Sequence, residues 1–234
     1  MARHEILTPE AHRTLRIKTQ RSAALGDGVM LCLTFPDEFR RLQNEYPIVF
    51  QLNAERTEFR AAVLFGFERD ENLYLKGETW DARYVPLSLD VQPFLIGRTR
   101  EPGREQVHID MGSARIGQSD GVRLFGDDGK PTSFLDGVAE KLGALHAGFQ
   151  GAPDFFAALQ RYELIEPFVF EALLADGAKR RLVGFHTINE EKLRALDAAA
   201  LGDLQERGFL LPIFMQVASL SNLAKLMDRK NANV

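Results

Sequence analysis

The sequence predicts an α+β fold: a single compact body with a mostly antiparallel sheet, two related helix–hairpin units and helices near the C-terminus. Of the 234 residues 45% are hydrophobic, and Phe alone occurs 17 times, which is enough apolar material for a substantial core. Short β-rich runs separated by turn residues fill much of the first half, and stretches with helical periodicity dominate the second. No low-complexity linker separates the halves, so we predict one domain over residues 1–234.

The first predicted helix begins at Pro36 and Asp37, since proline is favoured at the first helical position and an acidic side chain complements the helix dipole. The β-rich runs 47–50 and 64–67 then predict two strands joined by a polar turn. Short strands separated by turns are expected to continue through residues 72–111.

Helices are predicted at three places in the second half. Ser133 with Asp136 resembles a capping box and predicts the start of an amphipathic helix. A second helix is expected from Asn189, as the N-cap, to Arg207. The last predicted helix carries an apolar stripe that we interpret as core packing, formed by Leu220, Leu223, Ala224 and Met227.

Segments 36–67 and 153–185 share a pattern that predicts an internal repeat. Each begins with Pro-Asp, and the first eight residues of the two segments agree at five positions. Two further matches follow in the same order: Pro47–Phe50 with Pro167–Phe170, and Leu64–Phe67 with Leu182–Phe185. Convergence on a common helix–hairpin pattern is the alternative explanation. Duplication predicts that the two segments have the same strand pairing.

Composition excludes several classes of protein. The net charge of −4 is too small to favour nucleic acid or a membrane surface as the main partner. The single cysteine, Cys32, excludes an internal disulfide and lies in an apolar run, where we expect a buried structural thiol. The N-terminus has no apolar signal core, and no uncharged apolar stretch approaches the roughly 20 residues that cross a bilayer. We therefore expect a cytoplasmic protein without a membrane span.

The start of the chain is basic. Glu5 and Glu10 are the two acidic residues among the first 21, where the basic residues are Arg3, Arg13, Arg16, Lys18 and Arg21. An arm that docks a partner is one interpretation of this segment. A solvated terminal segment is the other, and it is the more common arrangement at a chain terminus.

No catalytic residue is predicted. The sequence lacks a Gly-x-Ser-x-Gly nucleophile motif, a phosphate-binding P-loop and a dinucleotide-binding glycine pattern. One metal-site hypothesis is open. His108 and Asp110 stand two apart in a predicted strand and so share a face, and His186 is a candidate third ligand for the two-histidine, one-carboxylate iron(II) set. The alternative interpretation is a hydrogen-bonded histidine on a half-exposed strand.

An aromatic segment is the predicted ligand-binding surface. Aromatic side chains with an arginine on a loop-rich scaffold make good binding anchors, and here they are Trp80, Arg83, Tyr84 and Phe94. A protein, a peptide or a glycan is the expected ligand, with no cofactor. The competing interpretation is that Trp80 and Phe94 simply close the core.

Short motifs along nearly the whole chain resemble the SapC-like family. They include Tyr46-Pro47-Ile48-Val49-Phe50, Gly77 to Trp80, Tyr84-Val85-Pro86, Leu182-Val183-Gly184-Phe185 and Ser219-Leu220-Ser221-Asn222-Leu223. This family is named from a bacterial surface-array locus, and in proteobacteria the genes of its members often lie near genes for outer-membrane TonB-dependent receptors. The resemblance therefore implies a link to the bacterial cell surface. It supplies no active-site residues.

Three functional hypotheses follow. The first is a non-enzymatic binding or accessory protein of a bacterial cell-surface or nutrient-uptake system. The second is a non-haem iron-dependent oxygenase-like enzyme that uses His108, Asp110 and His186. The third is a structural subunit that forms a homo-oligomer.

Overall fold

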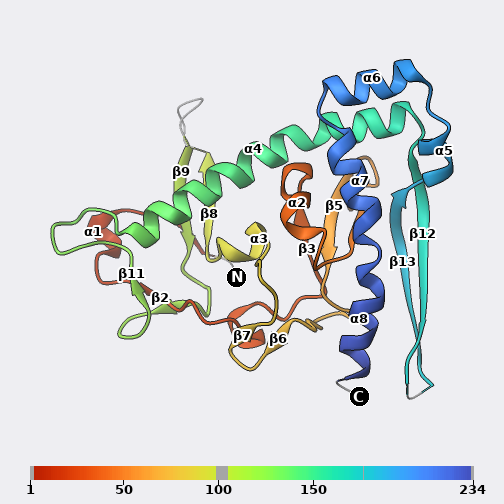
Figure 1. Cartoon of the computed structure of the whole chain (residues 1–234). Coiled ribbons are helices and arrows are strands. Elements are labelled where there is room, and N and C mark those ends of the chain that lie inside the picture. The colour runs from red at the N-terminus through yellow and green to blue at the C-terminus, as the bar shows by residue number, and fades with distance from the viewer. Residues whose placement is uncertain (1–2, 99–104, 176, 233–234) are drawn as a thin grey trace. The chain divides into compact units, whose positions relative to one another are not determined.

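The computed structural model describes residues 3–98, 105–175 and 177–232. Within these residues short helices, one long helix and antiparallel strands are mixed along the chain, so the predicted α+β class is confirmed (Figure 1). The contacts divide the chain into two compact units that do not follow the two halves of the sequence. Unit 1 comprises Met1–Gly28, Leu75–Asp81 and Leu87–Ala147; unit 2 comprises Val29–Tyr74, Ala82–Pro86 and Gly148–Val234.

Unit 1 holds three small antiparallel sheets among its described residues, with strand orders β1-β9-β8, β10-β2-β11 and β6-β7. Its strands are β1 (His4–Ile6), β2 (Arg16–Ile17), β6 (Leu75–Lys76), β7 (Thr79–Trp80), β8 (Phe94–Arg98), β9 (Glu105–Asp110), β10 (Ile116–Gly117) and β11 (Val122–Arg123). Its helical elements are α1 (Pro9–His12), α3 (Leu87–Asp90) and the first half of α4 (Ser133–Arg161).

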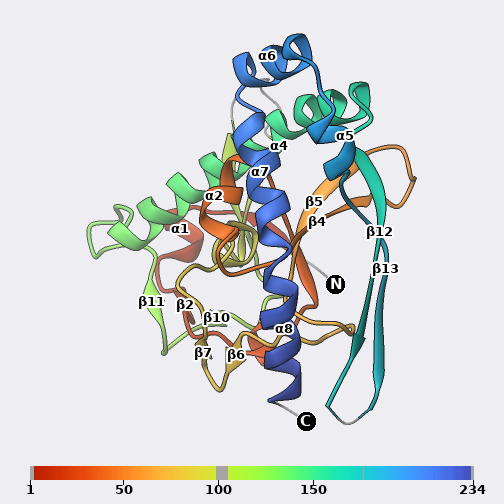
Figure 2. The same cartoon turned by 45° about the vertical axis from the view of Figure 1, so that its right-hand side comes forward.

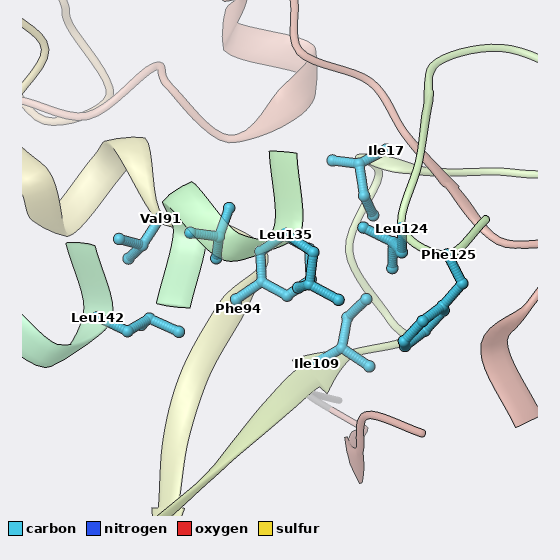
Figure 3. Close-up of a cluster of buried hydrophobic side chains, with 9 residues drawn as sticks. Ile17, Val91, Phe94, Ile109, Leu124, Phe125, Leu135 and Leu142 are labelled. Atoms are coloured by element: carbon cyan, nitrogen blue, oxygen red, sulfur yellow. The ribbon is translucent and has the colours of Figure 1, made fainter. Parts of the chain in front are cut away.

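The core of unit 1 is a cluster of apolar side chains from β8, β9 and α4 (Figure 3). Phe94 of β8 is 4% exposed and pairs with Ile109 of β9, which is fully buried. Leu135 and Leu142 bring one face of α4 into the same cluster. The alternation of β9 follows from strand geometry, since Ile109 is buried while its two neighbours are only partly covered.

Unit 2 is built on one five-stranded antiparallel sheet with strand order β12-β13-β4-β5-β3. Figure 2 shows β12 beside β13 and β4 beside β5. The strands are β3 (Leu31–Thr34), β4 (Ile48–Leu52), β5 (Phe59–Leu64), β12 (Ile165–Leu173) and β13 (Lys179–Ile188). The helices are α2 (Phe39–Leu42), the second half of α4, α5 (Glu190–Arg194), α6 (Ala198–Glu206), α7 (Leu210–Ser219) and α8 (Asn222–Asn231).

Aromatic rings make up much of the unit 2 core. Phe50 of β4 meets Phe156 of α4 edge to face at a centroid distance of 5.2 Å. Phe155, the neighbour of Phe156, makes the same kind of contact with Phe209 at 5.5 Å and with Phe39 at 6.2 Å. Edge-to-face pairs of this kind are favoured by the ring quadrupoles, in addition to the area that they bury.

The helices of the second half differ from the predictions in their caps and ends. The helix expected at Ser133 does begin there, but the hydroxyl of the preceding Thr132 is the group that accepts from the backbone N–H of Leu135, at 3.5 Å. Asn189 caps as predicted, yet its helix ends at Arg194, and Asp197 caps a separate α6. Of the stripe predicted on the last helix, Leu220 is the C-cap of α7 and the other three residues lie in α8. The two helices follow one another along the sheet in Figures 1 and 2.

Buried polar side chains attach α7 to the sheet and α8 to the segment between α2 and β4. The side-chain amide of Gln216 donates to the carbonyl of Ile48 at 2.8 Å, and the hydroxyl of Ser219 accepts from the Ile48 N–H at 3.0 Å. Asn222 donates to the carbonyl of Gln43 at 2.7 Å. These bonds explain the Ser219 to Leu223 motif as a structural one, because they satisfy main-chain groups that packing takes out of water.

Taken together, α7 and α8 (residues 210–231) are the one helical stretch among the described residues that is long and apolar enough to cross a membrane by length and composition. The same criterion is met by helices that lie in the core of a folded protein. In unit 2 the stretch includes Ile213 and Leu226, both with 0% exposure, and it covers the sheet through the polar bonds described above.

The two segments of the predicted repeat share only their order of elements. In each segment a helix is followed by an antiparallel hairpin, β4–β5 in the first and β12–β13 in the second. Asp176, in the predicted turn of the second hairpin, lies outside the described residues. Pro36 opens a short 3₁₀ turn, Pro36–Glu38, as predicted. Pro153 does not open a helix; it lies inside α4.

The strand pairing of the two hairpins differs as well. In the first, the backbone N–H of Leu64 donates to the carbonyl of Pro47 at 3.0 Å. The corresponding pair in the second would be Leu182 and Pro167, but Pro167 lies opposite His186. Matched residues therefore do not hold matched positions, and the structure gives the repeat no support beyond the helix–hairpin order.

Candidate functional site

The candidate site is a cavity of about 400 Å³ in unit 2, bounded by β3, β5 and the second half of α4. This volume lies within the range of roughly 300–1,000 Å³ that is typical of small-molecule sites. Three large apolar side chains on its wall, Leu33, Phe59 and Phe149, are only half-buried. Phe156, with 4% exposure, closes the inner side and stacks on Phe59 at 6.2 Å.

The wall formed by α4 carries an unusual polar group. Pro153 has no N–H, so it cannot donate to the carbonyl of Phe149 four residues earlier, as a residue in a helix interior ordinarily does. Residues four apart share one face of a helix, and both of these line the cavity. The helix that forms this wall therefore has one main-chain acceptor, the Phe149 carbonyl, that lacks its usual helical donor.

The rim of the cavity is pre-formed by the loop that joins β4 to β5. The side-chain oxygen of Asn53 accepts from the N–H groups of Thr57 at 2.8 Å and Glu58 at 3.2 Å. Such side-chain bonds to the following backbone hold a turn in one conformation. Thr57 and Glu58 line the cavity, so its mouth does not depend on a ligand for its shape.

A buried carboxylate lies behind the cavity wall. Glu38 is 3% exposed, and its oxygens accept from the hydroxyl of Thr34 at 2.6 Å and from that of Tyr84 at 2.9 Å. Burial, with the nearby Glu38 charge, raises the pKa of Tyr84 well above its ordinary value. Burial and then Glu38 also raise the pKa of Cys32, which supports the prediction of a structural thiol.

The four residues of the predicted binding surface fall in both units. Trp80 and Phe94 belong to unit 1, where Trp80 is half-buried on β7 and Phe94 lies in the core. In unit 2 the hydroxyl of Tyr84 donates a hydrogen bond to Glu38, and Arg83 lines a separate hollow of about 270 Å³. Neither unit by itself contains the predicted surface, and the burial of Phe94 agrees with the competing core interpretation.

The three predicted metal ligands are likewise divided. His108 and Asp110 share a face of β9 in unit 1, as the strand alternation predicted, while His186 belongs to unit 2. The carboxylate of Asp110 accepts from the N–H groups of Arg3 and Gly112, both at 2.9 Å, and these bonds lower its pKa.

The two histidines have their own neighbours. The ring of His108 covers Gly97, where an added Cβ would lie 2.1 Å from Nε2. His186 packs edge-on against Phe59 at 5.0 Å, and burial, followed by the charge of Arg56, lowers its pKa. Within the described parts of the chain, no group of three or more His, Cys, Asp or Glu side chains is placed to hold a metal ion.

The cavity residues were not predicted as a site. Neither Phe149 nor Glu38 belongs to a motif that predicts a binding or catalytic site. One signal pointed to the place: Pro153 stands within a helical pattern, where proline removes a backbone hydrogen bond. The grouping of β3, β5 and α4 around it depends on contacts distant in sequence.

Comparison with known proteins returns one family. No curated protein and no solved structure matches the chain. Residues 7–226 of the 234 match the SapC family, so the match spans nearly the whole sequence and both units. The predicted resemblance is confirmed, and the chain belongs to the SapC family.

Proposed function

We propose that this chain is a non-enzymatic binding protein whose unit 2 cavity holds an apolar ligand. The observation that carries the proposal is the set of half-buried side chains on the cavity wall, Leu33, Phe59 and Phe149. Full burial of a large apolar side chain contributes about 1.5–3 kcal/mol relative to full exposure, so an apolar occupant would gain part of this free energy at each contact.

The polar groups of the cavity describe the ligand further. The carbonyl of Phe149 favours an occupant with one hydrogen-bond donor. The charged groups at the rim, Glu58 and Arg60, lie 3.8 Å apart and are exposed, so they select little by charge. A compact, largely apolar molecule with a single donor fits these features best.

The wider part of the proposal is that the protein serves as an accessory component of a bacterial cell-surface or nutrient-uptake system and acts from the cytoplasm. Its support is membership of the SapC family together with the family associations that the resemblance implies. Photo-cross-linking in producing cells, from a probe placed at Ala157 on the cavity rim, tests it. Repeated recovery of an envelope or uptake protein supports this role, and cross-links confined to cytosolic enzymes contradict it.

Binding in the cavity is tested with a neutral, environment-sensitive dye such as Nile red, titrated into the full-length chain. We expect saturable fluorescence enhancement from the unaltered protein and its loss in Ala157→Trp, which places a large ring at the cavity rim. Ala199→Trp is the matched control, since Ala199 is also exposed on a helix of unit 2 but lies outside the cavity. No enhancement, or equal enhancement in both variants, overturns the assignment of this cavity.

A further inference from the structure

A second cavity, of about 350 Å³, lies within unit 1 and has a different chemistry. Its lining includes four basic residues, Lys18, Arg21, Arg115 and Lys141, and one acidic residue, Asp90. Lys18 and Arg21 belong to the basic N-terminal segment, for which a docking arm and a solvated terminus are the two interpretations.

The basic groups are held in place by carboxylates. Arg115, 1% exposed, donates from Nη2 to both oxygens of the fully buried Asp27 at 2.6 Å. Arg21 and Lys141 share Asp90, with 2.6 Å between Lys141 Nζ and Asp90 Oδ2. These are rigid, charge-assisted contacts, so the cluster is organised before any ligand arrives.

The charges around the cavity do not cancel. Lys18 pairs with Asp120 at 3.3 Å, which adds a third carboxylate to Asp27 and Asp90. Four cationic side chains therefore face three anionic ones, and one positive charge is left over. An occupant with a single negative charge would balance the cluster.

Further donors lie at the same place because α4 begins there. Ser133 and Phe134, the first two residues of this 29-residue helix, line the cavity. The N–H groups of Leu135 and Asp136 donate to the hydroxyl and the carbonyl of Thr132. The N–H groups of Ser133 and Phe134 have no hydrogen-bond partner among the described residues. Nε of Arg115, a residue that also lines the cavity, is buried and has no hydrogen-bond partner among the described residues. A helix N-terminus with free N–H groups favours an anion.

The remaining wall of the cavity is apolar. Ile17, Phe134 and Val138 contribute side chains to it, next to the core cluster of unit 1. Gly137, between two of these, leaves open space: an added Cβ would have no neighbouring atom within 4 Å. A bare inorganic anion would leave this apolar part unused.

We propose that the unit 1 cavity binds a small organic monocarboxylate, with its carboxylate among Arg21, Lys141 and the first N–H groups of α4, and its apolar body against Phe134 and Val138. The site is separate from the unit 2 cavity and does not depend on it, since the two share no residue. A monocarboxylate fits the single excess charge, and its apolar part fits the wall that phosphate would leave uncovered.

The test is calorimetric titration of the full-length chain with sodium hexanoate, sodium benzoate, neutral hexanamide and inorganic phosphate. We expect at least one of the two carboxylates to bind at one equivalent, and hexanamide and phosphate to bind at least about tenfold more weakly. Loss of one charge-assisted hydrogen bond predicts about a tenfold loss of affinity in Lys141→Gln. Lys130→Gln, which removes an exposed lysine elsewhere in unit 1, is the matched control and should bind like the unaltered chain.

A second pair of variants tests the location. Gly137→Leu fills the open space in the cavity and should abolish carboxylate binding, whereas Gly143→Leu, on the same helix and equally free of neighbours, should not. Circular dichroism of both variants checks that the helix is retained. Absence of carboxylate binding at millimolar concentration, phosphate or hexanamide binding as tightly as the acids, or equal binding by the two glycine variants would each overturn the proposal.

Discussion

The hydroxyl of Tyr84 donates a hydrogen bond to the buried carboxylate of Glu38, with 2.9 Å between the two oxygens. The main-chain carbonyl of Tyr84 in turn accepts from the hydroxyl of Tyr46, which is fully buried. The short segment Ala82–Pro86 is thus tied to the interior of unit 2 at both a side chain and a backbone group. The conformation of this segment therefore determines whether the buried Glu38 keeps the hydrogen bond from Tyr84.

Replacing Tyr84 with Phe should lower the free energy of unfolding by about 1–3 kcal/mol, because it removes one of the hydrogen bonds that a buried carboxylate accepts. Urea denaturation followed by circular dichroism measures the change. Tyr162→Phe is the control, since its hydroxyl bonds Asp203 at the surface, and it should lose much less. Equal losses in the two variants would show that the Glu38 contact is not special.

The buried ion pair of unit 1 should be far more sensitive than any surface pair. Asp27→Asn leaves Arg115 charged and without its carboxylate, a change that typically destabilises a protein by about 3–5 kcal/mol. Glu171→Gln removes an exposed pair with Arg181 and should change stability by no more than ~1 kcal/mol. Thermal unfolding of both variants provides the comparison, and a mild effect of Asp27→Asn contradicts the prediction.

Two glycines of α4 should respond to alanine with opposite signs. At Gly148 an added Cβ would lie 2.1 Å from the ring of Phe35, which is 4% exposed and has little room to move. We expect Gly148→Ala to destabilise the chain by about 1–3 kcal/mol through overpacking. At Gly143 nothing lies within 4 Å, so Gly143→Ala should stabilise the helix by ~0.5–1 kcal/mol. A shift of the same sign in both melting temperatures would refute this.

His186 should make stability depend on pH below neutrality. Its pKa is lowered in the folded state, chiefly by burial, whereas an unfolded histidine titrates near 6.5. As the pH falls below about 6.5 the unfolded chain therefore takes up a proton at this position more readily than the folded one, and the free energy of unfolding decreases. In His186→Gln the fall between about pH 7 and pH 5 should be shallower, as measured by urea titrations across that range. An unchanged slope counts against this assignment.

Trp80 should contribute less to stability than Phe94, although both are large aromatic residues of unit 1. Trp80 is half-buried at a strand end, and Phe94 lies in the core with 4% exposure. Phe94→Ala should therefore lower the free energy of unfolding by about 3–5 kcal/mol, and Trp80→Ala by clearly less. If Trp80→Ala alone unfolds the chain, Trp80 is a core residue and leaves the list of candidate ligand contacts.

Some of the structure was predictable because it depends on residues close together in the sequence. Asn189 caps a helix because its side chain reaches an N–H three residues later, and His108 and Asp110 share a face because a strand alternates. The prediction failed at Pro153 for an instructive reason. A proline in a helix interior is unfavourable in isolation, and contacts along a 29-residue helix outweigh that local penalty here.

By itself the sequence determined the α+β class, the antiparallel hairpins and family membership, all of which depend on patterns that repeat over a few residues. Only the tertiary structure decided which polar side chains are buried and which apolar ones face a cavity. From residue type alone Gln216 and Glu38 would be expected at the surface. In the folded chain both are buried, because Gln216 bonds Ile48 and Glu38 accepts from Thr34 and Tyr84. The cavities follow the same rule. Each forms where segments far apart in the chain pack without filling the space between them, and that depends on side-chain shapes that local sequence does not encode.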